Sequence, residues 1–146
     1  MLSQLIEVVT PRPEGENRFI GRNMHPGAFR VYGGQVLAQA VGAAVATVSE
    51  GRVIHSQHAY FLRPGDPRKP IVFEVERARD GGSFSSRRVV ALQDGKAILV
   101  ASMSFQQASR GDEYQRDMPL VPPPESLPNE RQLSLEAGRL DESFMI

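Results

Sequence analysis

The sequence predicts an α+β domain with one enclosed helix and an antiparallel sheet, and three observations carry that prediction. Residues 34–51, GQVLAQAVGAAVATVSEG, place apolar side chains at helical spacing and end at a glycine. Four strand-like runs follow, each bounded by turn residues. Asp94-Gly95 separates the last two runs and suits the type I′ turn of a β-hairpin. The expected order is therefore a buried helix followed by an antiparallel meander of four strands.

The predicted helix has an unusual second face. One stripe is apolar, whereas the opposite stripe, with Ala38, Gly42 and Ala46, is small and nearly uncharged where a surface helix normally carries charges. We therefore expect this helix to be enclosed on more than one side. Gly42 and the neighbouring alanines would let a sheet approach closely, because they carry little or no side chain.

The chain divides into three predicted segments, and turn residues separate the strands of the middle one. The four strands are expected at 53–62, 71–79, 83–93 and 96–107, and an earlier strand at 18–22. Residues 1–17 form an N-terminal segment with a short amphipathic helix that packs on the main body, and residues 18–107 form the domain. Residues 108–146 are a proline-rich linker whose end, 133–146, is expected to form one helix.

Composition excludes several classes of function. Seventeen basic residues balance seventeen acidic ones, so there is no electrostatic argument for nucleic acid as a partner. The chain has no cysteine, which excludes disulfides, thiol nucleophiles and cysteine-held metals. No apolar run approaches the ~20 residues of a membrane span. The first sixteen residues lack the basic start of a signal peptide, so we expect a cytoplasmic protein.

The pair Gly33-Gly34 precedes the predicted helix and supports two interpretations. The plainer one is that two glycines let the chain turn into a buried helix. The other is a binding role, because amide donors at a positive helix end suit a carbonyl or phosphate oxygen.

Two of the three histidines lie in one predicted strand. In a regular strand His55 shares a face with Gln57 and Ala59, whereas His58 shares the other face with Tyr60, so both cannot bind one metal. Each is a plausible general base because imidazole titrates near neutrality. The commoner role is a histidine hydrogen-bonded on a sheet face. His25, in a loop, is a weaker candidate.

The segment 80–88, DGGSFSSRR, offers several small polar residues but no base at a spacing that would make a serine a nucleophile. A turn between strands is its simplest role. Arg87 and Arg88 point to opposite faces of a strand, so one could meet a phosphate while the other pairs with an acid. A solvated sheet edge is the simpler expectation for both, and Arg63 beside a Pro-Gly turn has the same ambiguity.

Two long stretches together are distinctive. Residues 31–44, VYGGQVLAQAVGAA, and residues 53–107, with HSQHAYFLRPGDP and RDGGSFSSRRV, resemble the first hotdog domain of the acyl-CoA thioesterase II family. The resemblance runs from about Phe19 to Gln107 and continues through the linker to Pro128. It implies a hotdog fold, in which a curved antiparallel sheet wraps a long central helix. It also implies hydrolysis of acyl-CoA to free fatty acid and CoA without a metal or another cofactor.

The resemblance also indicates which residues face the substrate. In this family the usual catalytic aspartate, serine or threonine, and glutamine come from a second hotdog domain, so no position of this chain receives them. The first domain's side of the cleft corresponds to Gly33, Gly34 and Gln35 for substrate binding, and to His55 as a catalytic candidate. Three further substrate-binding positions follow from it: Gly82, Ser83 and Phe84.

Two functions from different classes follow. The first is the N-terminal hotdog half of an acyl-CoA thioesterase, weak or inactive without the second hotdog domain, because no Asp or Glu lies between Gly34 and Ser49. The alternative is a noncatalytic acyl-binding or assembly module. In either case we expect a second hotdog domain as partner or self-association as a dimer, since an unpaired sheet edge with an apolar patch favours association.

Overall fold

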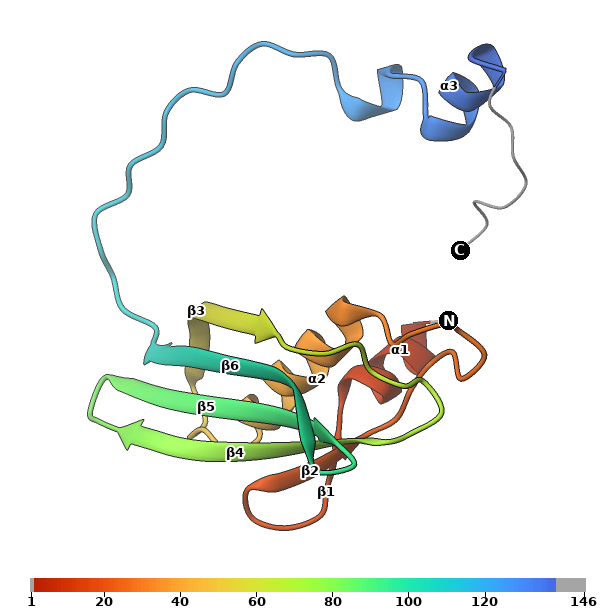
Figure 1. The fold of residues 1–146 in the computed structure, drawn as a ribbon. Helices are drawn as coiled ribbons and strands as arrows, with labels where there is room; N and C mark the ends of the chain where they lie inside the picture. Colours follow the sequence, from red (N-terminus) through yellow and green to blue (C-terminus); the bar gives the residue numbers. More distant parts are fainter. Residues whose placement is uncertain (1, 139–146) are drawn as a thin grey trace. The chain divides into compact units, whose positions relative to one another are not determined.

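The computed structural model describes residues 2–138 of the chain, which divides into two compact units between Arg110 and Gly111. The first unit is a six-stranded, fully antiparallel sheet with two helices, α1 (Leu2–Val9) and α2 (Gly33–Val45) (Figure 1). Its strands are β1 (Arg12–Pro13), β2 (Arg18–Gly21), β3 (Arg52–Phe61), β4 (Ile71–Asp80), β5 (Phe84–Gln93) and β6 (Lys96–Gln107). The predicted α+β class is thus confirmed.

The strand order is β1-β2-β4-β5-β6-β3, so the expected four-stranded meander is wrong. Only β4, β5 and β6 form one, whereas β3 pairs with β6 at the edge of the sheet. The connection between β3 and β4, with Pro64, Gly65 and Pro67, is too long for a tight hairpin and carries the chain to a non-adjacent strand. The β5–β6 turn is as expected, because Asp94 and Gly95 both have positive φ, at 48° and 72°.

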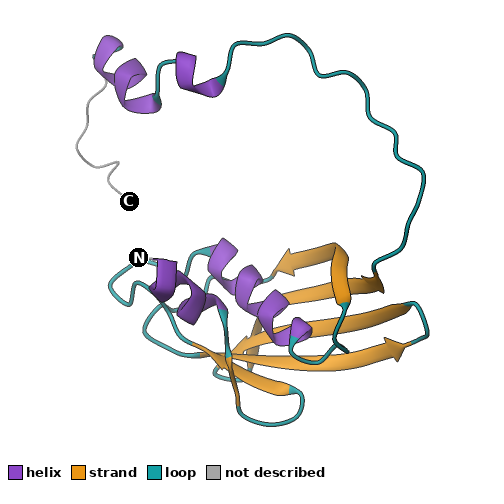
Figure 2. Cartoon of the chain, turned by 180° about the vertical axis from the view of Figure 1, so that it is seen from behind, coloured by secondary structure: helices purple, strands orange, loops and turns teal. Residues whose placement is uncertain are grey.

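Helix α2 lies against one face of the sheet, and α1 packs on α2 from another side (Figure 2). The side chain of Gln39 joins these elements, because its Nε2 donates to the carbonyl of Val8 at the end of α1 and to that of Arg22 after β2. The helix is shorter than expected. It ends at Val45, and a turn follows in which the Thr47 hydroxyl donates to the carbonyl of Ala44.

Gly42 has a different role from the expected one. A Cβ at this position would lie 2.7 Å from the carbonyl oxygen of Val9 and 2.9 Å from Cδ of Pro11. The close neighbour of Gly42 is therefore the N-terminal segment and not the sheet. The sheet instead contacts the alanine face of α2, where Ala40, Ala43 and Ala44 are fully buried.

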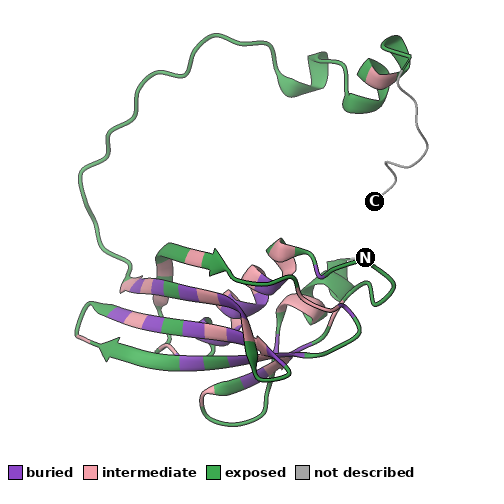
Figure 3. Cartoon of the chain, viewed as in Figure 1, coloured by how far each residue is buried: buried purple, intermediate pink, exposed green. Residues whose placement is uncertain are grey.

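The core lies between α2 and the inner face of the sheet, and burial alternates along the central strands (Figure 3). Phe73, Val89, Leu99 and Phe105 are fully inaccessible to solvent. We call the face that carries them the inner face, and the opposite face the outer face.

The second unit begins at Gly111 with an extended, exposed stretch. It contains a 3₁₀ turn at Pro124–Ser126 and the helix α3 (Glu130–Glu136), which Asn129 and Gln132 cap reciprocally. One continuous helix over 133–146 was expected, and of the described residues 133–138 only 133–136 are helical, because α3 ends at Glu136 and Gly138 has a positive φ of 64°. Residues 139–146 lie outside the described part of the chain. No helix in residues 2–138 is long and apolar enough to cross a membrane.

Candidate functional site

The start of α2 presents two free backbone donors. Tyr32 is the N-cap residue and caps the helix with no side-chain hydrogen bond. The Tyr32 carbonyl accepts from the amides of Gln35 and Val36, whereas the amides of Gly33 and Gly34 donate to no group among residues 2–138. A positive helix end with free N–H groups is suited to a carbonyl or phosphate oxygen.

The aromatic rings of Tyr32 and Phe61 lie against these two glycines. A Cβ at Gly33 would come within 3.1 Å of the Phe61 ring, and a Cβ at Gly34 within 2.5 Å of the Tyr32 ring. Glycine therefore leaves the helix start open between two exposed aromatic side chains.

Gln35 lies beside the glycines but is held by the preceding loop. Its Nε2 donates to Oδ1 of Asn23 at 2.9 Å and to the carbonyl of Arg22 at 3.2 Å, while its Oε1 accepts from the amide of Met24 at 3.2 Å. In the structure the Gln35 amide group stabilises this loop, and substrate binding by Gln35 stays a prediction.

His55 lies on the outer face, because β3 contains a bulge. The register shifts between Ile54 and Ser56, and Ile54 and Ala59 both pack on the core although an odd number of steps separates them. Ser104 lies between two buried residues of β6 and so points outward, and Nε2 of His55 is 2.8 Å from its Oγ. The expectation that His55 shares a face with Gln57 and Ala59 is therefore wrong.

The bulge also places His58 on the outer face, where it pairs with Ser102 and contacts the Tyr60 ring. Thus the two histidines share a face, contrary to the expectation for a regular strand. The described residues nevertheless contain no group of three or more His, Cys, Asp or Glu that could hold a metal ion.

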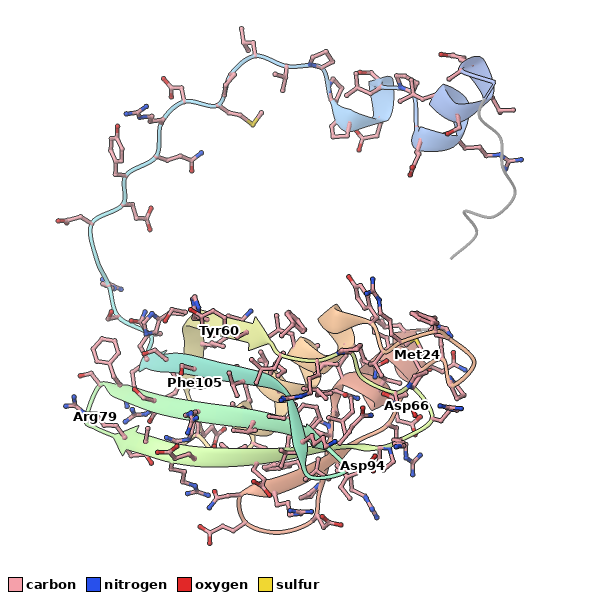
Figure 4. The ribbon with its side chains drawn as sticks, in the orientation of Figure 1. Met24, Tyr60, Asp66, Arg79, Asp94 and Phe105 are labelled. Carbon is pink, nitrogen blue, oxygen red and sulfur yellow. The ribbon has the colours of Figure 1, made fainter. Side chains whose placement is uncertain are left out.

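The remaining predicted residues, Gly82, Ser83 and Phe84, lie at the turn between β4 and β5. The Phe84 ring meets the imidazole of His55 edge to face, with centroids 5.7 Å apart. A hollow of about 390 Å³ lies at this turn and is lined by Arg79, Gly81, Gly82, Ser83, Phe84 and Ser86. Figure 4 shows Arg79 at this end of the sheet and Asp94 at the opposite end.

Buried hydrogen bonds hold the turn from the inner side. Arg87, only 2% exposed, donates to Oδ1 of Asp80 at 2.7 Å and to both the hydroxyl and the carbonyl of Thr47 after α2. The buried Ser85 hydroxyl donates to the same Asp80 oxygen at 2.6 Å. The hydrogen bond from Ser85 has the largest effect and that from Arg87 the next largest, and together they hold the pKa of Asp80 below its usual range.

Arg52 completes this network from β3. Its guanidinium donates to the Ser85 hydroxyl at 2.9 Å and to the carbonyls of Gly81 and Gly82 at 2.5 and 2.9 Å. The turn that lines the hollow is therefore tied to the same strand that carries His55.

The network around Arg87 was not predicted from the sequence. A solvated sheet edge was expected for Arg87, but the structure buries it, while Arg88 is exposed and pairs with Glu76 at 3.4 Å. Arg63 donates to the carbonyl of Ala97. The adjacent positions of Arg87 and Arg88 in β5 indicated that only one of them can point into the core. The sequence could not show the partners of Arg87, because they lie in other elements.

The predicted site residues fall into two groups at opposite ends of β3. His55 and the β4–β5 turn lie near its beginning, whereas Gly33 lies against Phe61, its last residue. Six residues of extended strand span about 20 Å. Within this chain the two groups are thus too far apart to act on one reacting bond.

Comparisons with known proteins agree with this architecture. Residues 20–106 match the family described as acyl-CoA thioesterase N-terminal domain. The chain is 47% identical over 121 residues to human acyl-coenzyme A thioesterase 8, covering 82% of this chain and 38% of the relative. It is 40% identical over 130 residues to acyl-CoA thioesterase 2 of Haemophilus influenzae, covering 89% and 46%. The chain thus spans less than half the length of these curated relatives.

Solved structures give the same picture. A tesB protein of Mycobacterium avium subspecies paratuberculosis superposes with a TM-score of 0.78 at 42% identity, covering 86% of this chain and 50% of that one. A hotdog protein of Alicyclobacillus acidocaldarius superposes with a TM-score of 0.72 at 21% identity, covering 86% and 48%, which supports the fold alone. The chain has the hotdog fold and belongs to the family of acyl-CoA thioesterase N-terminal domains.

Proposed function

We propose that the chain is the N-terminal hotdog half of an enzyme that hydrolyses fatty acyl-CoA to free fatty acid and CoA, and that it is weak or inactive without a second hotdog domain. Its membership of the family and its coverage of less than half of each curated relative support this proposal. On this view residues 18–107 are the hotdog domain after the N-terminal segment 1–17, and residues 108–146 are the linker and the start of the second domain.

The observation that carries the proposal is the separation of the two residue groups along β3. The free edge of β3 lies at the end of the sheet, where another strand can add. The edge strand of a second hotdog domain could pair with β3 in the antiparallel direction. The beginning of β3 would then lie beside the end of that strand, and the end of β3 beside its beginning. The free amides of Gly33 and Gly34 would then face strand residues of the second domain, and His55 would face that domain's helix start.

The chemistry requires such a partner. In hydrolysis a water oxygen attacks the thioester carbonyl carbon, the carbon–sulfur bond breaks, and the CoA sulfur leaves and takes up a proton. The amides of Gly33 and Gly34 are suited to the carbonyl oxygen as negative charge develops on it. A base that could activate the water is missing at the start of α2, because this helix carries no Asp or Glu. His55 is the candidate at the other end of β3, where it would act with Gly82, Ser83 and Phe84 as substrate contacts.

Self-association as a dimer is the alternative to a second domain. Val53, Tyr60 and Phe61 of β3 each expose more than half of their surface, which favours burial against another chain. The cytoplasmic location expected from the sequence remains a prediction, and fractionation of the producing cells with antibody detection would test it.

A noncatalytic acyl-binding or assembly module is the second candidate. The absence of a carboxylate on α2 favours it, because the helix then offers amide donors without a base. Both the thioesterase half and the noncatalytic module are expected to bind acyl-CoA, but only the thioesterase half takes part in its hydrolysis.

The test is CoA release from a medium-chain acyl-CoA, followed with a thiol reagent. It is run on the chain alone and after addition of the separately expressed remainder of the Haemophilus influenzae relative, the part that this chain does not cover. That relative is 40% identical to this chain over the shared 130 residues. His55→Ala is measured beside the wild type, with His25→Ala as the matched control in an exposed loop.

Activity restored only by the partner domain is the expected result. Activity of the chain alone that His55→Ala abolishes would refute the half-enzyme and show a self-sufficient thioesterase. Acyl-CoA binding without turnover, even in a stable complex with the partner domain, would establish the noncatalytic module instead.

A further inference from the structure

We propose that the hollow at the β4–β5 turn binds a phosphate group, with the Arg79 guanidinium as its cationic contact, and that this phosphate belongs to the nucleotide end of acyl-CoA. The second half of this proposal rests on the proposed function, whereas phosphate binding itself does not.

Arg79 is an exposed cation at this end of the sheet. Three neighbouring arginines have acidic partners: Arg77 pairs with Glu16 at 3.6 Å, Arg87 with Asp80, and Arg88 with Glu76. Arg52 has no acidic partner but is bound to the Ser85 hydroxyl and to the carbonyls of the turn. The Arg79 side chain makes no hydrogen bond or ion pair with any residue from 2 to 138, and it lines the hollow. A guanidinium is a planar fork of donors that matches two phosphate oxygens at once.

The lining of the hollow is suited to an anion. It contains no carboxylate, and the hydroxyls of Ser83 and Ser86 have no hydrogen-bond partner within the described range 2–138. Its volume of about 390 Å³ leaves room for more than a phosphate group alone. Both hydroxyls can therefore donate to phosphate oxygens.

The Arg52 network sets the direction of two backbone donors. In a trans peptide the carbonyl of one residue and the amide of the next point in opposite directions. Because Arg52 binds the carbonyls of Gly81 and Gly82, the amides of Gly82 and Ser83 point away from Arg52. Neither amide has a partner among the described residues, and both residues line the hollow. Successive amides directed alike form the backbone concavity that binds anions.

The position of the hollow connects it with the proposed substrate. Phe84 lines the hollow and also meets the His55 ring, so a phosphate bound here would lie next to the His55 end of β3. The hollow would then hold the charged end of the substrate on the outer face, where solvent reaches it.

The test is calorimetric titration of the full 146-residue chain with adenosine 3′,5′-bisphosphate, the phosphate-bearing nucleotide of CoA, and separately with inorganic phosphate and with pantetheine. Arg79→Gln removes the charge, and Arg79→Lys keeps it without the planar fork. Arg88→Gln is the matched control, because Arg88 is an exposed arginine on the same face that already has an acidic partner. Circular dichroism verifies that the variants fold.

We expect the wild type to bind the bisphosphate, and Arg79→Gln to bind it about tenfold more weakly, which corresponds to one charge-assisted hydrogen-bonding contact. Arg88→Gln should bind as the wild type does, and pantetheine should show no dependence on Arg79. Equal affinity of Arg79→Gln and the wild type, or no binding of either phosphate compound, would overturn the proposal. Equal affinity for inorganic phosphate and the bisphosphate would support the phosphate site and refute its nucleotide assignment.

The binding of the bisphosphate can be measured independently of thioester hydrolysis. If Arg79-dependent binding is found while the reassembled enzyme releases no CoA, the proposed function fails and the phosphate site stands. If the reassembled enzyme is active and Arg79→Gln leaves both its KM and the nucleotide affinity unchanged, the phosphate site fails and the proposed function stands.

Discussion

Asp80 shows how one exposed carboxylate is tied to buried partners. Its side chain is about half exposed, yet one of its oxygens accepts from the buried Ser85 and Arg87. Because these bonds require the ionised form, the pKa of Asp80 is lower in the folded chain than in the unfolded one. The stabilisation that the ionised Asp80 provides is thus complete at pH values above the pKa of this group in the unfolded chain. It is lost as the pH falls through the pKa of the same group in the folded chain.

We therefore expect Asp80→Asn to reduce the acid sensitivity of the fold. The urea midpoint of the wild type should fall between about pH 6 and about pH 3 more than that of the variant, because only the wild type loses the ionised Asp80. Asp112→Asn, a change in the exposed second unit, is the control and should follow the wild type. Parallel midpoints for Asp80→Asn and wild type would exclude the carboxylate as a source of the pH dependence.

Arg87 is the buried counterpart of this pair. Arg87→Leu should lower the free energy of unfolding by about 3 kcal/mol, because it leaves the carbonyl of Thr47 without its Arg87 donor and Asp80 without its charged partner. Arg88→Leu, which breaks only the exposed pair with Glu76, should cost less than about 1 kcal/mol. Urea unfolding of both variants measures the difference, and similar losses would contradict the buried network.

At the scale of elements, the contact between α1 and α2 depends on the missing side chain of Gly42. Gly42→Ala should increase helix propensity by about 1 kcal/mol, but its Cβ would collide with Val9 and Pro11. We expect α1 to leave α2, so amides of Leu2–Val9 should lose hydrogen-exchange protection while β5 and β6 keep theirs. Gly27→Ala, where a Cβ meets nothing within 4 Å, should leave α1 protected. Undisturbed protection of α1 in Gly42→Ala would show that the segment moves aside without cost.

At the scale of the whole molecule, the open edge of β3 predicts association. The chain alone should sediment as a dimer or larger species at high concentration, since β3 exposes both unpaired backbone groups and apolar side chains. Phe61→Lys should shift it toward monomer, because a charge at this edge opposes strand addition. Leu5→Lys, at an exposed apolar position of α1, should associate as the wild type does. A shift with Leu5→Lys instead would place the interface on α1.

The sequence by itself determined the class of the fold and the positions of most elements. The helical repeat after Gly33, the alternation in β5 and β6 and the Asp94-Gly95 turn are local signals, because periodicity and turn chemistry depend on neighbours along the chain. The long motif stretches likewise indicate the family, because they are continuous along the chain.

Tertiary structure alone decided how the candidate site is built. The bulge at His55 exists because Ile54 and Ser56 pair with Phe105 and Ser104, about fifty residues away. The partners of Arg87 are Thr47 after α2 and Asp80 in β4, which no local pattern relates to β5. Strand order, register and buried polar pairs depend on contacts between residues remote in the chain, and these contacts place the two halves of the site at opposite ends of β3.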